Sequence, residues 1–171
     1  MNEAMKFCPY CAEPLSVRED AGRKRLYCTF EQKYIYRNPI PAATGLILNK
    51  DNRILLVLRA REPGKNEWGL PGGFVEDDES PIFAARREVL EETGLTVDDP
   101  ELINVVYQES DFYNTSILII GYRFLEYAGD LIAGDDAAEA KFFPLDQLPE
   151  LAFSSHRALI DEMTERYLQT S

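Results

Sequence analysis

The sequence predicts a mixed-sheet α/β sandwich preceded by a small β-rich subdomain that carries the cysteines. Apolar runs typical of strands recur from residue 42 onward, and only two segments carry helix start and stop signals. Strands in hairpins around two helices favour a sandwich over a doubly wound parallel fold. The stretch RNPIP, residues 37–41, resists helix because of its two prolines. We therefore expect domains at residues 1–37 and 38–171.

The strands are predicted from apolar runs between polar turns. The runs at 43–48 and 53–60 flank the turn-rich tetrapeptide NKDN and predict a β-hairpin. Residues 103–108 and 115–127 predict two more long strands, and 139–143 a shorter one.

Two helices are marked by their ends. The segment at 80–94 has Ser80 as N-cap, Pro81 at the first helical position and Gly94 at the C-terminal stop. The segment at 154–169 has Ser154 or Ser155 as its cap. These two segments are predicted to be the helices of the sandwich.

Length and charge exclude several functions. A chain of 171 residues suits one domain plus a small appendage. Its net charge of −12 argues against a nucleic-acid partner bound through phosphate neutralisation, and would repel an anionic substrate unless bound cations reversed the local field. Neither a signal peptide nor a membrane-spanning run is predicted. Three cysteines, two of them in CPYC, favour a reducing cytoplasm and a metal site.

The segment REVLEETG, residues 87–94, places three glutamates on one helix face. Glu88, Glu91 and Glu92 stand at i, i+3 and i+4, where like charges destabilise a helix by roughly 0.2–0.5 kcal/mol per pair. Either the face is solvated or a cation lies among the carboxylates. Ligation by oxygen alone suits Mg²⁺ or Mn²⁺ better than Zn²⁺.

The segment before this helix supports the second alternative, a cation bound among the carboxylates. GLPGGFVEDDES, residues 69–80, leads to the spacing Gly73-x5-Glu79-x7-Arg87-Glu88-Val89-x-Glu91-Glu92-x-Gly94-Leu95. This spacing is that of the Nudix box, and the chain resembles the Nudix hydrolases, in detail over residues 68–95 and in layout over 42–168. The resemblance implies an α/β/α sandwich that hydrolyses a diphosphate with divalent metal.

The resemblance also implies roles for individual residues. Glu88 and Glu92 are metal ligands, Gly73 contributes a carbonyl, and Glu91 is a ligand or the general base. Arg87 pairs with Glu79 and holds the loop to the helix. A further family carboxylate falls on Asp136, where Glu is more usual, so its part as ligand or base competes with that of a solvated acidic turn.

Six residues are candidates for contacting the substrate. The basic ones stand near the end of a strand or in the loop before the box and are weighed against ordinary surface charge. The aromatic ones offer a wall for a flat ring and are weighed against the core. They are Arg59, Arg61, Lys65, Tyr107, Phe112 and Tyr113. Trp68 is expected to pack in the core, and His156, the only histidine, to be a helix-terminus residue.

The cysteines resemble the zinc ribbon that precedes some Nudix domains. Cys8 and Cys11 form one pair, whereas the second pair is CTFE, with Cys28 followed by Glu31 where a fourth cysteine is expected. A structural Zn²⁺ held by these four residues and a degenerate ribbon held by packing remain the two alternatives.

The tail at 142–160 resembles members that act on ADP-ribose or FAD, which are the favoured substrates. Dinucleoside polyphosphates, NADH and nucleoside triphosphates are the alternatives. A ligand-binding or regulatory Nudix module is the alternative that is not an enzyme. Neither a nucleic acid nor a membrane is expected as a partner, and a homodimer remains open.

Overall fold

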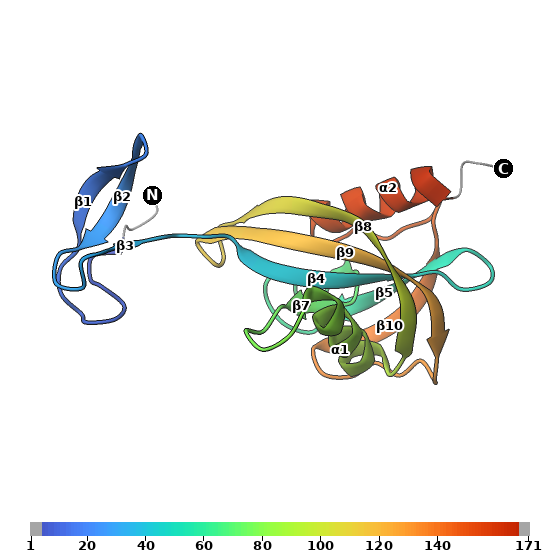
Figure 1. Cartoon of the computed structure of the whole chain (residues 1–171). Coiled ribbons are helices and arrows are strands. Elements are labelled where there is room, and N and C mark those ends of the chain that lie inside the picture. Colours follow the sequence, from blue (N-terminus) through green and yellow to red (C-terminus); the bar gives the residue numbers. More distant parts are fainter. Residues whose placement is uncertain (1–4, 168–171) are drawn as a thin grey trace.

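The N-terminal part of the protein is a small antiparallel sheet of its own. The structure, a computed structural model, describes residues 5–167. The sheet has the order β1-β2-β3, with β1 at Ser16–Asp20, β2 at Arg23–Cys28 and β3 at Lys33–Ile35. Figure 1 shows it at one end of the molecule, joined to the rest by an extended segment. Arg37 in that segment donates a hydrogen bond of 2.6 Å to the carbonyl of Asn114.

The rest of the chain is built on two further sheets. The first has the order β7-β4-β9-β8 and the second β10-β5-β6. In the first, β4 runs parallel to β9 and every other pair is antiparallel, so the predicted mixed sheet is confirmed. The strands are β4 (Ile40–Ile47), β5 (Arg53–Arg59), β6 (Trp68–Gly69), β7 (Gly72–Phe74), β8 (Thr96–Ser110), β9 (Thr115–Ala128) and β10 (Ala137–Pro144).

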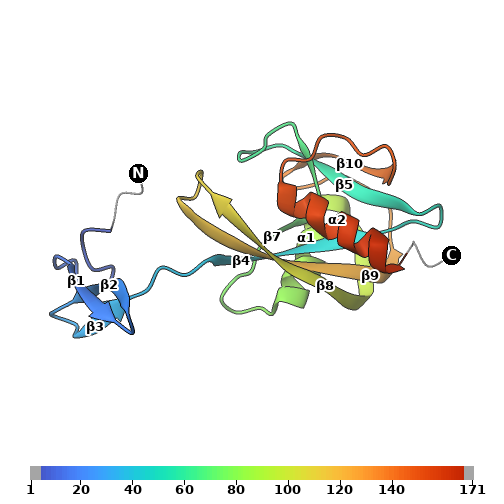
Figure 2. The same ribbon diagram turned by 90° about the horizontal axis from the view of Figure 1, so that it is seen from above.

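Two helices cover opposite sides of these sheets, α1 at Pro81–Thr93 and α2 at Ser154–Tyr167 (Figures 1 and 2). Each helix packs on its own core. Beneath α2 the core includes Leu46, Ile54, Leu56, Ile119, Leu159 and Met163. Beneath α1 it includes Ala43, Ile47, Leu55, Ala85, Val89 and Phe124. The predicted α/β sandwich is therefore confirmed.

Strands β4 and β5 do not form the predicted hairpin. They meet only at an isolated bridge, Leu48 to Ile54, and then enter different sheets. The reason is that both strands are apolar on both faces: Leu46 and Ile47 point into the two different cores. A strand of that kind needs cover from both helices, which a two-stranded hairpin does not supply.

Helix α1 follows its local signals, whereas the start of α2 does not. The Ser80 side chain accepts a hydrogen bond from the Phe83 amide, and Gly94 ends α1 in the left-handed conformation. Ser155, a predicted cap, instead donates its hydroxyl hydrogen to Gln108 on β8.

Trp68 packs against the core, as predicted, and its ring lies edge-on to Phe143. Neither helix within residues 5–167 has the length and apolar character needed to cross a membrane.

Candidate active site

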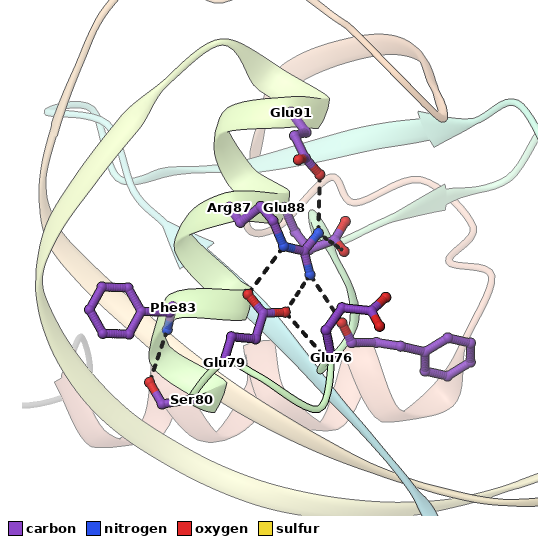
Figure 3. A network of polar contacts seen from close by, with 8 residues as sticks. Glu76, Glu79, Ser80, Phe83, Arg87, Glu88 and Glu91 are labelled. Atoms are coloured by element: carbon purple, nitrogen blue, oxygen red, sulfur yellow. Dashed lines mark hydrogen bonds and ion pairs between the residues drawn. The ribbon is translucent and has the colours of Figure 1, made fainter.

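A cluster of charged side chains lies where the loop before α1 meets the helix. Arg87 binds both oxygens of Glu79, with 3.2 Å from Nε to Oε2 and 2.6 Å from Nη2 to Oε1. Its Nη2 also donates to the carbonyl of Phe74 at 3.2 Å, so one guanidinium ties β7 and the following loop to the helix (Figure 3). These hydrogen bonds from Arg87 lower the pKa of Glu79.

The same guanidinium reaches two of the three box glutamates. Its Nη1 lies 2.7 Å from Glu88 and 3.1 Å from Glu91 (Figure 3). Burial nevertheless raises the pKa of Glu88, with Arg87 opposing the shift. The exposed Glu91 carboxylate turns toward Arg87. Arg87 therefore offsets part of the like-charge repulsion on α1, but none of its hydrogen bonds reaches Glu92.

Glu92 is the most buried of these carboxylates, with 4% of its surface exposed. Its Oε2 accepts a hydrogen bond of 2.9 Å from the Gly72 amide. Its pKa is raised to about 8, mainly by burial, with the nearby Glu88 and Asp136 adding to the shift and the Gly72 amide and Arg59 opposing it. A buried carboxylate with two acidic neighbours is costly to ionise unless a cation compensates the charge.

Two glycines let the loop approach these groups. A Cβ atom at Gly73 would overlap the Glu88 carboxylate, and one at Gly72 would overlap the backbone of β4. Only glycine permits this approach without displacing the acidic side chain. The backbone of Gly73 is thereby brought next to Glu88.

These groups line one side of a pocket of ≈ 280 Å³. Its acidic side contains Glu88, Glu92, Asp135 and Asp136. Its apolar and aromatic side contains Phe74, Tyr113, Ile117, Ile119 and Phe153, and Arg59, Gln108, Ser110 and His156 add polar groups. A concave site that combines an apolar side with polar groups and carboxylates of raised pKa has the features of an active site.

The donor set of the acidic side fits a hard divalent cation. It offers carboxylate oxygens and backbone carbonyls, which are the ligands preferred by Mg²⁺ and Mn²⁺. Oδ1 of Asp136 is buried and lies 2.7 Å from Nη1 of Arg61, so this carboxylate forms an ion pair at the edge of the pocket.

The structure brings some of the six candidate substrate residues together and separates others. Arg59 and Tyr113 line the pocket. Arg61 is exposed and reaches Asp136 at the pocket's edge. Three residues are exposed and outside the pocket lining: Lys65, Tyr107 and Phe112. Tyr107 alternates with Gln108 on β8, so that the neighbouring polar residue faces the pocket instead.

Sequence reasoning missed the side of the pocket opposite α1. Gln108, Phe153 and His156 all line it. Gln108 had one usable signal, because it is a polar residue at the inward phase of a strand. Phe153 and His156 come from the start of α2, and nothing local in the sequence places that turn beside β8.

The N-terminal sheet holds the three cysteines together. The sulfur atoms of Cys8, Cys11 and Cys28 lie within 4.8 Å of one another, and all three thiols are free. The Glu31 amide donates to Cys28 Sγ at 3.4 Å. The Glu31 carboxylate, however, lies 3.4 Å from Lys33 Nζ and is not gathered with the sulfurs.

The acidic cluster around the buried Glu92, the glycine loop and the partly aromatic pocket fit a class of protein, the hydrolases that act on phosphoanhydrides with divalent metal. The chain belongs to the NUDIX domain family, whose model matches residues 38–163. This membership confirms the resemblance carried by the box, and the protein is a Nudix pyrophosphohydrolase.

Relatives with assigned functions extend this result. The chain is 41% identical to an ADP-ribose pyrophosphatase of Methanocaldococcus jannaschii over 77% of this chain and 78% of that protein. It is 28% identical to the NAD-capped RNA hydrolase NudC of Stutzerimonas stutzeri, covering 95% of this chain but only 56% of that longer protein. Among solved structures, the NUDIX domain of Shewanella oneidensis NrtR complexed with ADP ribose is 25% identical. It has a TM-score of 0.65 and covers 77% of this chain and 90% of that one.

Proposed function

We propose that the protein hydrolyses the diphosphate bond of a nucleoside diphosphate linked to a second group, with ADP-ribose the first candidate and FAD the second. Support comes from the relative named ADP-ribose pyrophosphatase and from the similar NUDIX domain complexed with ADP ribose. The observation that carries the proposal is the pocket itself. Its acidic side suits a metal-bound diphosphate, and its aromatic side suits an uncharged ring.

The proposed metal is Mg²⁺ or Mn²⁺, held by Glu88, Glu92, the Gly73 carbonyl and Asp136. When bound, such an ion neutralises phosphate oxygens and lowers the pKa of a coordinated water. It would also remove the conflict between an anionic substrate and a chain of net charge −12. The position of Asp136 in the same pocket lining as Glu88 and Glu92 supports its inclusion, and Arg61 would have to release its Oδ1 atom.

Side chains of the protein would then accept the proton and bind the phosphates. Glu91 is proposed as a further ligand or as the base that takes a proton from the attacking water. Its exposed carboxylate lies outside the pocket lining and 3.1 Å from Arg87, which it must leave for either role. The water oxygen bonds to one phosphorus while the bridging P–O bond breaks. Each half leaves as a phosphate monoester, and no other reactant is consumed.

Arg59 is proposed to bind the diphosphate. Its Nε donates to the Pro63 carbonyl at 2.7 Å, and its guanidinium carbon lies 5.1 Å from the centre of the Phe153 ring. These contacts fix the guanidinium at the pocket while leaving other N–H groups for phosphate oxygens. Arg61 is proposed to act beside it; its ion pair with Asp136 at the pocket edge supports this role.

The N-terminal sheet is proposed as a separate structural domain, residues 1–37, that binds Zn²⁺ through its three cysteines. Three thiolates leave one of zinc's four positions open. Glu31 is the proposed fourth ligand, for which its carboxylate must leave Lys33. The hydrogen bond from the Glu31 amide to Cys28 Sγ supports a metal-binding turn at this point.

The test is a substrate panel with and without metal. It should contain ADP-ribose, FAD, NADH, a dinucleoside polyphosphate and nucleoside triphosphates, each incubated with Mg²⁺, with Mn²⁺ and with EDTA. We expect AMP and ribose 5-phosphate from ADP-ribose, only when metal is present. Tight ADP-ribose binding without turnover on any substrate would instead support a ligand-sensing module.

A further inference from the structure

The start of α2 is tied into the molecule at three points. The Ala152 amide donates to the Trp68 carbonyl at 2.8 Å, and the Leu70 amide donates to Nδ1 of His156 at 3.0 Å. The third is the hydrogen bond from the Ser155 hydroxyl to Oε1 of Gln108. Three residues within the five-residue stretch 152–156 therefore contact both the segment before the glycine loop and strand β8. This stretch forms one end of the pocket.

The Leu70 contact determines which nitrogen of His156 carries hydrogen. A backbone N–H can only donate, so Nδ1 is an acceptor and the neutral ring bears its hydrogen on Nε2. Burial, with Arg59 nearby, lowers the pKa of His156 to about 3, so the ring is neutral in the working range. His156 lines the pocket, and Nδ1 is already used. Nε2–H is thus the group of this side chain that remains to donate.

The Ser155 contact orients Gln108 in a similar way. Ser155 is buried, and its hydroxyl donates to Oε1 of Gln108. With the amide oxygen engaged on that side, the two N–H groups are left for the pocket that Gln108 lines. Gln108 pairs in register with Ile117 on β9, so the sheet fixes its backbone as well. This polar residue is held as a donor at a fixed place.

We propose that His156 Nε2–H and the Gln108 amide form a paired hydrogen-bond donor site for the uncharged half of the substrate beside the diphosphate. Both groups are neutral hydrogen-bond donors, whereas Arg59, which lines the same pocket, is a charged one. Neutral donors suit an acceptor atom that carries no formal charge, such as a purine ring nitrogen or a sugar oxygen. A site of this kind rejects analogues that lack the acceptor, because its own groups are then left unpaired. The inference rests on the proposed function.

Paired variants separate substrate contact from support of the glycine loop. His156→Asn keeps an acceptor near the Nδ1 position for the Leu70 amide but does not reach the Nε2 position. His156→Gln keeps a donor near Nε2 and gives up the acceptor. Gln108→Met removes the donor at nearly constant shape. Arg157→Gln, at the next and exposed residue of α2, is the matched control.

The primary readout is the Kd, by calorimetry in Mg²⁺, of ADP-ribose with a methylene group in place of the bridging oxygen, which cannot be hydrolysed. KM and kcat for ADP-ribose in Mg²⁺ are measured beside it. His156→Asn and Gln108→Met should each weaken binding about tenfold, the size of a lost donor to a neutral acceptor, with kcat within about threefold of wild type. His156→Gln should mainly lower kcat. Arg157→Gln should match wild type. Circular dichroism and thermal melts identify any variant that fails to fold, and the other donor's variant then carries the test.

Further analogues with the same methylene bridge assign the acceptor. A 7-deaza-adenine analogue removes a ring nitrogen, and a deoxy-sugar analogue removes a hydroxyl oxygen. The analogue that lacks the true acceptor should bind wild type about tenfold more weakly and lose nothing further in Gln108→Met or His156→Asn. Unchanged Kd in both variants, or no binding of the methylene-bridged ADP-ribose by folded wild type, overturns the inference. Failure of turnover with these Kd ratios intact overturns only the proposed hydrolysis.

Discussion

At the scale of single residues, Glu92 couples stability to metal binding. It is buried beside Glu88 and Asp136, and its one hydrogen bond comes from the Gly72 amide. Glu92→Gln should keep the shape of the side chain while removing the charge that holds the cation. We expect turnover to fall by about a hundredfold or more. The melting temperature in EDTA should rise by a few degrees, because a neutral amide avoids the cost of burying this carboxyl group beside two acidic neighbours.

Glu165→Gln is the matched control for Glu92→Gln, since Glu165 is an exposed glutamate on α2. It should change neither the rate nor the melting temperature. A Glu92→Gln enzyme with near wild-type rates would contradict the metal assignment.

Two neighbouring arginines on α1 allow a comparison between a part-buried and an exposed ion pair. Arg87 makes two hydrogen bonds to the mostly buried Glu79, whereas Arg86 pairs with Asp98, whose side chain is 73% exposed. Arg87→Ala should lower the free energy of unfolding by about 2 kcal/mol and also reduce the rate, because the loop is no longer tied to the helix. Arg86→Ala should cost less than about 1 kcal/mol. Urea unfolding and steady-state kinetics measure both.

A loss of activity in Arg87→Ala without any loss of stability would assign Arg87 to the substrate rather than to the loop. That result would contradict the structural role given to its contacts with Glu79 and Phe74.

At the scale of elements, local signals predicted structure well only where the structure is itself local. Helix α1 begins after Ser80 and ends before Gly94 as expected, because capping depends on neighbouring residues alone. Strands β4 and β5 were identified but paired wrongly. Their partners lie far away in sequence, and a turn such as NKDN does not reveal that both faces of each strand are covered.

The candidate site likewise has one side that the sequence predicts and one side that it does not. Most of its acidic side comes from the loop and helix at 72–92, which is one continuous segment with a recognisable spacing, and Asp135 and Asp136 join it from the turn before β10. Its opposite side combines β8 with the first turn of α2, where Gln108 and Ser155 are 47 residues apart. Alternation along β8 can place Gln108 on a face, but no local rule reveals which turn that face will meet.

The N-terminal sheet gives a prediction at this scale about its metal. Purified protein should contain about one zinc per chain if Glu31 completes the site. Glu31→Cys should retain zinc longer against a chelator, because thiolate is the softer ligand, and Glu31→Ala should release it sooner. Lys33→Met, which removes the competing cation, should slow release relative to wild type.

Elemental analysis and chelator competition measure these zinc effects. Diphosphate cleavage should survive all three changes in part, because none of the residues lining the acidic pocket comes from the N-terminal sheet. Folded protein without zinc after careful purification would mean that packing alone holds this sheet together.

At the scale of the whole molecule, the free energy of unfolding should depend on pH through His156. This side chain is buried, and its pKa is lowered to about 3, whereas an unfolded histidine titrates near 6.5. Between these two pH values the unfolded chain binds a proton that the folded protein does not. Stability from this group is therefore fully present above about pH 6.5 and declines as the pH falls toward 3.

The expected loss from pH 7 to pH 5 is about 2 kcal/mol, since one proton contributes about 1.4 kcal/mol per pH unit in this window. Urea unfolding of wild type and His156→Asn at a series of pH values measures it. Every carboxylate is common to both proteins, so the difference between the two curves isolates the imidazole. His156 is the only histidine in the chain, and its NMR signals can be followed without ambiguity. Signals that titrate near pH 6 in the folded protein, or parallel stability curves, would show that the ring is solvated and that the Leu70 contact does not hold it.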